Sequence, residues 1–414
     1  MPREHRWGWG PGIVFLLTAI GPQDLVSNSA AGAEFQYSLL WALVPVLVIR
    51  YAILEASARY VLATGESLMN GYARMGRWLM PVLFLVILAK RLVSGLYQVV
   101  MLGQAIDIMV PPGLQGHRTV WALASWALGF AVIWWGRYRV VERASVPLLM
   151  LLGGSIVLAA LGSRPDWGLA LHGLIVPSLP PGRHGAGYPL ILMALIGSGA
   201  ASLSNLKYAS FVRERGWRDT SFLRRQRIDL AVSGGLFITM LFLLQVAAAA
   251  TLGRRGVTLS NVEDLLPVFT TALGPFGRII FGIGVWTAVF TTFIGANTGY
   301  SMLMADIWHG VLSPAARPVE HPTDTPAYRW TILLFSVPPL LVLFATWNPV
   351  WLALAVAIAL AALTPLIVVA LLWLCNNGKL MGQHANGWVS NVTLTVALLG
   401  TLFLTYTAAA SFAR

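Results

Sequence analysis

The run GPQDLVSNS (residues 21–29) interrupts an apolar segment that extends from residue 11 to residue 36. A proline, a carboxylate, two amides and two hydroxyls therefore fall near the middle of a stretch long enough to cross a bilayer. The lipid core offers no water to unpaired backbone groups, so such an interruption is stable only where it is buried in protein or lines a cavity. The run predicts a discontinuous membrane helix that presents Asp24 and main-chain oxygens to a solute.

The composition of the whole chain agrees with a membrane protein. Hydrophobic residues make up 57% of the 414 positions, charged residues make up 11%, and the mean hydropathy is +0.71. Soluble domains carry roughly 25% charged residues. A single cysteine, Cys375, excludes an intrachain disulfide and is expected to be a small buried apolar residue. No nucleophile and base pair, phosphate-binding loop or Cys/His zinc pattern is apparent, so we expect neither an enzyme nor a resident cofactor.

Segments of about 20 mostly apolar residues predict the membrane spans. Eleven such segments predict an all-α polytopic fold, and residues 1–414 form a single transmembrane domain because no loop between spans is long enough to fold separately. The expected spans are residues 11–36, 38–63, 78–105, 119–136, 144–163, 188–212, 228–252, 274–307, 330–346, 349–375 and 389–411.

The basic residues, which give a net charge of +12, predict the orientation of the chain. With the N-terminus in the cytoplasm, the inner loops hold Arg3, Arg6, Arg74, Arg77, Arg137, Arg139, Arg143, Arg213, Arg215, Arg218, Arg224, Arg225, Arg227, Arg317, Arg329 and Lys379. The opposite face holds Arg118, Arg164, Arg183, Arg254, Arg255 and Arg414. The positive-inside rule then predicts a cytoplasmic N-terminus and an extracytoplasmic C-terminus in a bacterial inner (plasma) membrane. Because these residues border the spans, their expected partner is membrane lipid, and a nucleic-acid partner is excluded.

A second polar run, IGSGAASLSN (residues 196–205), lies in the sixth expected span. Spans one and six are five apart, which matches transporters built from two inverted five-helix repeats whose first helices are broken near the bilayer midplane. We therefore predict repeat one at about residues 11–163, repeat two at about residues 188–375, and an appended helix at about residues 389–411. The alternative is that the small residues of span six only permit close helix packing.

Charged residues inside spans are costly and are functional candidates. Glu55 and Arg59 lie four residues apart and are expected to form a structural ion pair. Lys90 and Arg91 point about 100° apart, so we expect different partners, one of them a carboxylate. Asp229 and Asp306 lie at expected cytoplasmic helix ends and are interpreted as solvated. The residues inside the spans are Asp24, Arg50, Glu55, Arg59, Lys90, Arg91 and Lys207.

Several stretches resemble the Nramp family of metal-ion transporters, in the same order along most of the chain. They are GPG (residues 10–12), AGAEFQYSLLW (31–41), LEASAR (54–59), GLIVPSLP (173–180) and NVEDLL (261–266). The resemblance implies the inverted-repeat fold and the transport of a divalent metal ion by alternating access.

The chain departs from that family at the residues that carry its chemistry. The family's Asp-Pro-Gly-Asn motif matches residues 21–24, where the first aspartate is replaced by Gly21 and a carboxylate stands at Asp24. The family's Met-Pro-His matches residues 202–204, and the proton-carrying acids of span three are replaced by a region with Lys90, Tyr97 and Val100. The resemblance to Nramp-related magnesium carriers, which lack those acids, implies transport without proton coupling.

The candidate substrate site is a set of hard oxygen donors at the two polar runs. Such donors suit Mg²⁺ or Mn²⁺ better than softer metals, with Asp24 as the charged ligand. The expected site residues are Thr18, Gly21, Gln23, Asp24, Asn28, Gly199, Ser202, Ser204 and Asn205.

A second hypothesis is a carrier of a small organic or zwitterionic solute on the same scaffold. Exposed helix N-termini would then hold a carboxylate. Lys90, Arg91 and Lys207 would take the place of a coupling ion. A channel, a sensor or an inactive relative are further alternatives.

Overall fold

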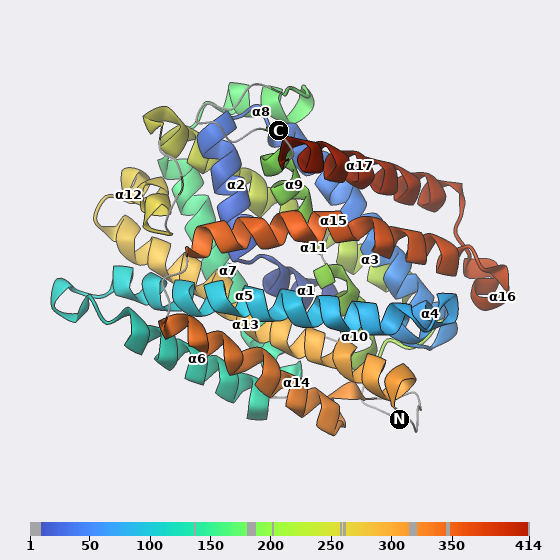
Figure 1. Ribbon diagram of the computed structural model, residues 1–414. Helices are drawn as coiled ribbons and strands as arrows, with labels where there is room; N and C mark the ends of the chain where they lie inside the picture. The colour runs from blue at the N-terminus through green and yellow to red at the C-terminus, as the bar shows by residue number, and fades with distance from the viewer. Residues whose placement is uncertain are drawn as a thin grey trace.

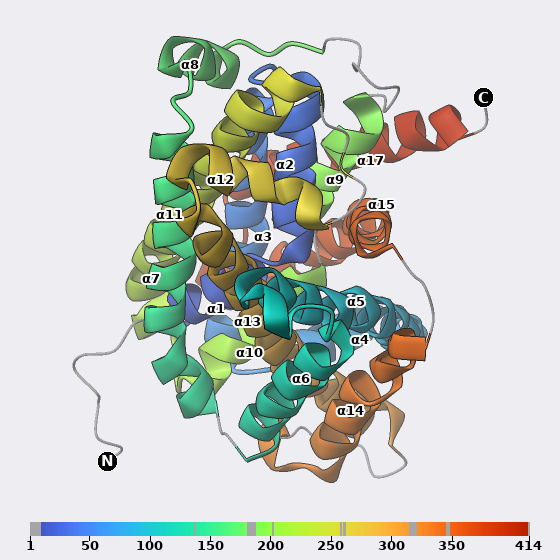
Figure 2. The ribbon, with the colours of Figure 1, turned by 90° about the vertical axis from the view of Figure 1, so that its left-hand side faces the viewer.

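The computed structural model describes residues 10–135, 138–179, 188–200, 203–256, 259, 262–313, 321–344 and 348–412, which form helices and no strand. The all-α expectation is therefore confirmed (Figures 1 and 2). The α-helices are α1 Pro11–Ala19, α2 Pro22–Phe35, α3 Leu43–Thr64, α4 Leu68–Met75, α5 Leu79–Met109, α6 Arg118–Trp135, α7 Tyr138–Gly162, α8 Trp167–Ile175, α9 Tyr188–Gly199, α10 Leu206–Glu214, α11 Leu223–Ala248, α12 Leu266–Leu273, α13 Phe276–Ile307, α14 Pro326–Ser336, α15 Pro349–Cys375, α16 Gly378–Met381 and α17 Trp388–Phe412.

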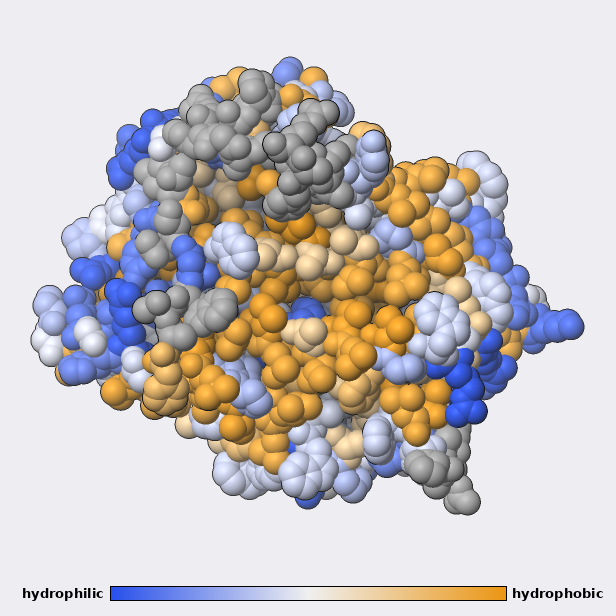
Figure 3. All heavy atoms as spheres, in the orientation of Figure 1, coloured by the Kyte–Doolittle hydropathy of each residue, from blue (hydrophilic) through white to orange (hydrophobic). Residues whose placement is uncertain are grey.

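The surface carries a wide apolar band between two hydrophilic ends (Figure 3). Within the described residues, seven helical segments are long and apolar enough to cross a membrane, or eight if α7 and α8, which meet at 115°, form one span. The first expected span is divided into helices of 9 and 14 residues, neither of which crosses a bilayer alone. Eleven spans and two inverted repeats therefore stay a prediction.

The first interruption follows from Gly21 and Pro22. Helix α1 ends at Ala19, Ile20 and Gly21 are extended, and α2 begins with Pro22 at its first position. Proline disfavours the helical conformation of the residue before it but fits the first turn of a new helix, where its missing N–H is not needed. The Thr292 hydroxyl of α13 donates to the carbonyl oxygen of Ile20 at 3.1 Å, which satisfies one backbone group freed by the break.

The second interruption separates α9 from α10. Helix α9 ends at Gly199, a 3-10 turn covers Leu203–Asn205, and α10 follows directly. A Cβ atom at Gly197 would lie 1.8 Å from the carbonyl oxygen of Ala357, so only glycine allows α9 to approach α15 this closely. The small residues of this segment therefore serve close packing as well as the break.

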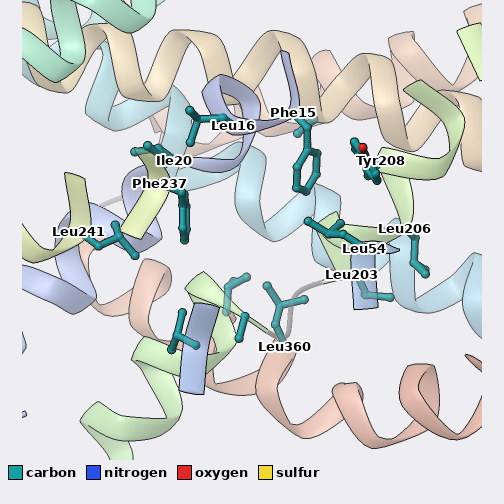
Figure 4. Packing of buried hydrophobic residues seen from close by; sticks show 14 of the residues in the cluster. Phe15, Leu16, Ile20, Leu54, Leu203, Leu206, Tyr208, Phe237, Leu241 and Leu360 are labelled. Atoms are coloured by element: carbon teal, nitrogen blue, oxygen red, sulfur yellow. The ribbon is translucent and has the colours of Figure 1, made fainter. Parts of the chain in front are cut away.

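Both interruptions lie inside the protein. All residues of α2 are buried. In the apolar stretch of 18 residues within Tyr188–Glu214, 81% of the residues are buried, whereas 39% are buried in the corresponding stretch of α5. Side chains of α1, α10 and α11 pack together beside the breaks, and the rings of Phe15 and Tyr208 lie 5.6 Å apart (Figure 4). The freed backbone groups are thus shielded from lipid.

Charged side chains at the ends of the spans are paired. Arg59 Nε lies 3.1 Å from Glu55, as expected, and Arg227 of α11 adds a second contact to that carboxylate at 2.9 Å. The interpretation of Asp306 as a solvated helix cap is wrong, whereas Asp229 is partly exposed. Asp306 is 4% exposed and pairs with Arg213 at 3.1 Å, and Asp229 accepts a hydrogen bond from the Gly12 N–H at 2.6 Å.

Candidate functional site

Asp24 lies in the first turn of α2 and is 1% exposed. Its Oδ2 accepts a hydrogen bond from the Gly21 N–H at 3.0 Å, which caps the start of the helix. Its Oδ1 is buried and has no hydrogen-bond partner among the described residues. One carboxylate oxygen therefore stabilises the break, and the other is available to a ligand.

Two asparagines leave an oxygen free in the same way. The Asn28 amide nitrogen donates to the carbonyl oxygen of Asp24 at 2.9 Å, and that of Asn205 donates to the carbonyl oxygen of Ala200 at 2.6 Å. The side-chain oxygens of both residues are buried without a partner in the described part of the chain. Asp24 and Asn28 are four residues apart on α2, so they share one helix face.

Helix α9 meets α2 at this face. The hydroxyls of Ser27 and Ser198 lie 3.0 Å apart, and Ser27 is three residues from Asp24 on α2. Ser27 and Ser198 join the two interrupted segments although they are 171 residues apart in sequence. The structure thus brings the two predicted polar runs together at Asp24.

Arg50 of α3 belongs to the site but was not among the predicted site residues. Its Nη1 donates to the carbonyl oxygen of Gly199 at 2.8 Å, and its guanidinium lies 3.9 Å from the ring centre of Phe237. It also interacts electrostatically with Asp24. Arg50 therefore occupies one acceptor position of the Gly199 carbonyl oxygen, and the place of Gly199 in the substrate site stays a prediction. The feature of the sequence that could have identified Arg50 is a charged residue inside an apolar, span-length segment.

Other predicted residues gather around Tyr300 of α13 instead of Asp24. The Tyr300 hydroxyl lies 2.9 Å from Lys90 Nζ and 3.0 Å from the Ser204 hydroxyl, and Lys207 Nζ lies 4.9 Å from the centre of its ring. Arg91 Nε donates to Asn297 Oδ1 at 2.7 Å. We call Lys90, Arg91, Ser204, Lys207 and Tyr300 the Tyr300 cluster.

The expected carboxylate partner of Lys90 or Arg91 is not found within the part of the chain that the structure describes. The lone acidic residue in the sequence of α5 is Asp107 near the end of that helix, where it pairs with Arg118 at 3.2 Å. Basic side chains therefore dominate the middle of this helix.

For three predicted site residues, Thr18, Gln23 and Ser202, the structure gives fewer contacts. Thr18 belongs to the last turn of α1, whose final carbonyls have no partner within the helix. The side chain of Thr18 and all of Ser202 lie outside the described residues. Gln23 is 9% exposed, and its amide nitrogen has no partner in the described ranges. Among the described residues, no group of three or more His, Cys, Asp or Glu side chains is placed to hold a metal ion.

Comparison with known proteins places the chain in a family. A family model described as natural resistance-associated macrophage protein-like matches residues 12–411. The chain belongs to the Nramp family. Two bacterial relatives bear the name divalent metal cation transporter MntH. The protein of Bacillus subtilis is 22% identical over 412 residues, which cover 94% of this chain and 89% of the relative. The protein of Chromohalobacter salexigens is 28% identical over 321 residues, which cover 71% of this chain and 70% of the relative. Nramp membership confirms the predicted resemblance and the expectation of a transporter family rather than an enzyme.

Solved structures show the same fold. The structure of the Eremococcus coleocola manganese transporter, in complex with an aromatic bis-isothiourea substituted compound, superposes on this chain with a TM-score of 0.73 at 16% sequence identity. The superposition covers 97% of this chain and 87% of the transporter. The structure of MhsT in complex with L-phenylalanine gives a TM-score of 0.57 at 14% sequence identity. It covers 97% of this chain and 100% of MhsT. The fold of this chain is therefore shared with a manganese transporter and with a protein that binds L-phenylalanine.

Proposed function

We propose that this Nramp-family chain is a secondary transporter that moves a divalent metal ion, Mg²⁺ or Mn²⁺, across the membrane by alternating access. The observation that carries the proposal is the set of buried oxygens without donors, Oδ1 of Asp24 and Oδ1 of Asn28, on one face of α2. A buried acceptor without a partner is costly, and a hard cation would satisfy both oxygens at once. The names of the MntH relatives support the same class of substrate.

The metal ligands in this proposal come mainly from the first interruption. Asp24 supplies the negative charge, Asn28 an amide oxygen, and the end of α1 the open carbonyls near Thr18. Helix C-terminal ends attract cations, which favours an ion at this place. A single carboxylate beside Arg50 offers little net charge, so the ion keeps part of its water shell, as Mg²⁺ commonly does.

Transport without proton coupling is part of the proposal. A proton moving along α5 would need a carboxylate or imidazole that titrates in its path. The middle of α5 instead offers Lys90 and Arg91, and Arg91 keeps a permanent positive charge where a coupling ion would travel. We therefore expect metal flux to follow the metal gradient and the membrane potential.

We place the protein in a bacterial inner membrane with its N-terminus in the cytoplasm. The basic residues of α4 and α16 support this orientation, since both helices lie at one end of the molecule while α12 lies at the other (Figure 1).

Reconstitution into liposomes tests the function. Wild-type protein is expected to carry Mn²⁺ or Mg²⁺ inward, without a change in the signal of an internal pH dye. A transported amino acid or amine with no divalent flux would contradict the metal assignment, and acidification coupled to metal entry would contradict the absence of proton coupling.

The second candidate is a zwitterionic or anionic organic solute. Arg50 and Lys207 both carry positive charge and interact electrostatically, and the carboxylate of such a solute would balance that charge. A carboxylate bound to Arg50 would compete with the carbonyl oxygen of Gly199. The same liposomes distinguish the two candidates through counterflow of labelled amino acids.

A further inference from the structure

The Tyr300 cluster concentrates positive charge without a negative partner. Lys90, Arg91 and Lys207 interact electrostatically with one another. No ion pair joins any of the three to an acid in the described ranges. Burying an unpaired charge costs several kcal/mol. The cluster therefore lacks a compensating charge.

Loss of a proton does not solve this problem for Arg91. A lysine ammonium can become neutral in an apolar site, but a guanidinium stays charged in proteins. Arg91 is 0% exposed, only its Nε has a protein acceptor, and Nη1 and Nη2 are buried with no partner in the described chain. Two donors of a permanent cation are thus left without an acceptor.

Three helices enclose the Tyr300 cluster. Arg91 lies on α5, Lys207 on α10 and Tyr300 on α13, and these helices pack around the cluster. Lys207 crosses Gly299, where a Cβ atom would lie 2.5 Å from its Cδ. Because Arg91 is 0% exposed, a ligand that reaches its Nη groups has to be small.

We propose that the Tyr300 cluster is a binding site for a small monovalent anion, either a halide or the carboxylate group of a small acid, held by the two Nη groups of Arg91. The ammonium groups of Lys90 and Lys207 add charge, and the Tyr300 hydroxyl can donate a hydrogen bond. The site is separate from the metal ligands at Asp24, and it is independent of which solute crosses there.

The test compares anions at constant ionic strength. Purified protein in detergent is exchanged into sodium methanesulfonate, and bromide or acetate replaces that anion stepwise while thermal unfolding is followed by tryptophan fluorescence. A saturable rise in Tm with bromide identifies a halide site, a rise with acetate alone identifies a carboxylate site, and a rise with both supports the shared chemistry. Identical unfolding in all three anions overturns the proposal.

Variants locate the effect. Arg91→Gln is expected to weaken the apparent anion affinity more than about tenfold, since it removes the charge that holds the ion. Arg227→Gln is the matched control, because its guanidinium is 52% exposed and pairs with Glu55, and the anion-dependent rise should stay. If Arg91→Gln does not fold, Lys90→Met at the edge of the cluster should show a weaker dependence.

A direct observation does not depend on any variant. Crystals of the wild-type protein grown in bromide should give an anomalous peak in contact with Arg91 Nη1 or Nη2. Crystals without such a peak, from protein whose Tm does not respond to acetate, would refute the site.

Discussion

The regions around the two interruptions of the membrane helices differ in the buried groups that they leave unsatisfied. At the first, between α1 and α2, the described chain leaves without partners the oxygens Oδ1 of Asp24 and Asn28 on one face of α2, together with the amide nitrogen of Gln23. At the second, Arg50 and Asn205 already bond the carbonyls of Gly199 and Ala200, and the neighbouring Tyr300 cluster is rich in donors. A break in a helix therefore does not define a ligand by itself. The side chains that reach the freed backbone decide whether it attracts a cation or an anion.

The largest effect is expected from Asp24→Asn. The change keeps the shape of the side chain but removes the negative charge of the metal site, so Mn²⁺ or Mg²⁺ uptake into liposomes should fall more than about tenfold. Asp219→Asn is the control, since this exposed carboxylate caps a loop through the Ser221 N–H and an asparagine caps equally well.

Asp24→Asn also leaves Arg50 without its counter-charge. The double variant Asp24→Asn/Arg50→Gln removes both charges and should fold better, yet it should still fail to transport metal. Uptake within twofold of wild type in either variant would show that Asp24 is not the metal ligand.

Arg50→Gln alone separates the two candidate substrates. Glutamine can still donate to the Gly199 carbonyl, while the positive charge beside Asp24 is lost. For a divalent cation, the apparent Kd should fall about threefold to tenfold, measured by Mn²⁺ titration. Loss of binding of an anionic solute would favour the second candidate. Arg74→Gln, at a surface pair with Glu66, should leave the affinity unchanged.

A smaller effect is expected where α2 meets α9. Ser27→Ala and Ser198→Ala each remove one side of the hydroxyl pair. A double-mutant cycle should give a coupling of about 1 kcal/mol in detergent stability, with metal affinity lowered a few-fold when Ser198 is changed. Additive single effects would mean that the pair does not hold the two interruptions together.

The smallest effect on metal binding is expected from Tyr300→Phe. The change removes the hydroxyl between Lys90 and Ser204 and should cost about 1 kcal/mol of stability. The metal Kd should stay within twofold of wild type if the Tyr300 cluster and the metal site are separate. A parallel change in metal affinity would show that the two regions act as one site.

Sequence alone predicted features that depend on local chemistry. Pro22 and the polar run around it define the first break, and the four-residue spacing of Glu55 and Arg59 defines their ion pair. The contacts of Arg50 with Gly199 and of Lys90 with Tyr300 were not predicted, because they join residues 149 and 210 positions apart. Which buried polar atoms remain unpaired depends on such distant packing, so the separation of oxygens from cations became visible only in the fold.

Diffraction from crystals soaked in Mn²⁺ tests the central claim most directly. The account predicts an anomalous peak about 2–2.5 Å from Asp24 Oδ1, on the side of Asn28 Oδ1 and away from the Tyr300 cluster. Well-diffracting crystals with no peak at Asp24, or with manganese bound elsewhere in the protein, would contradict it.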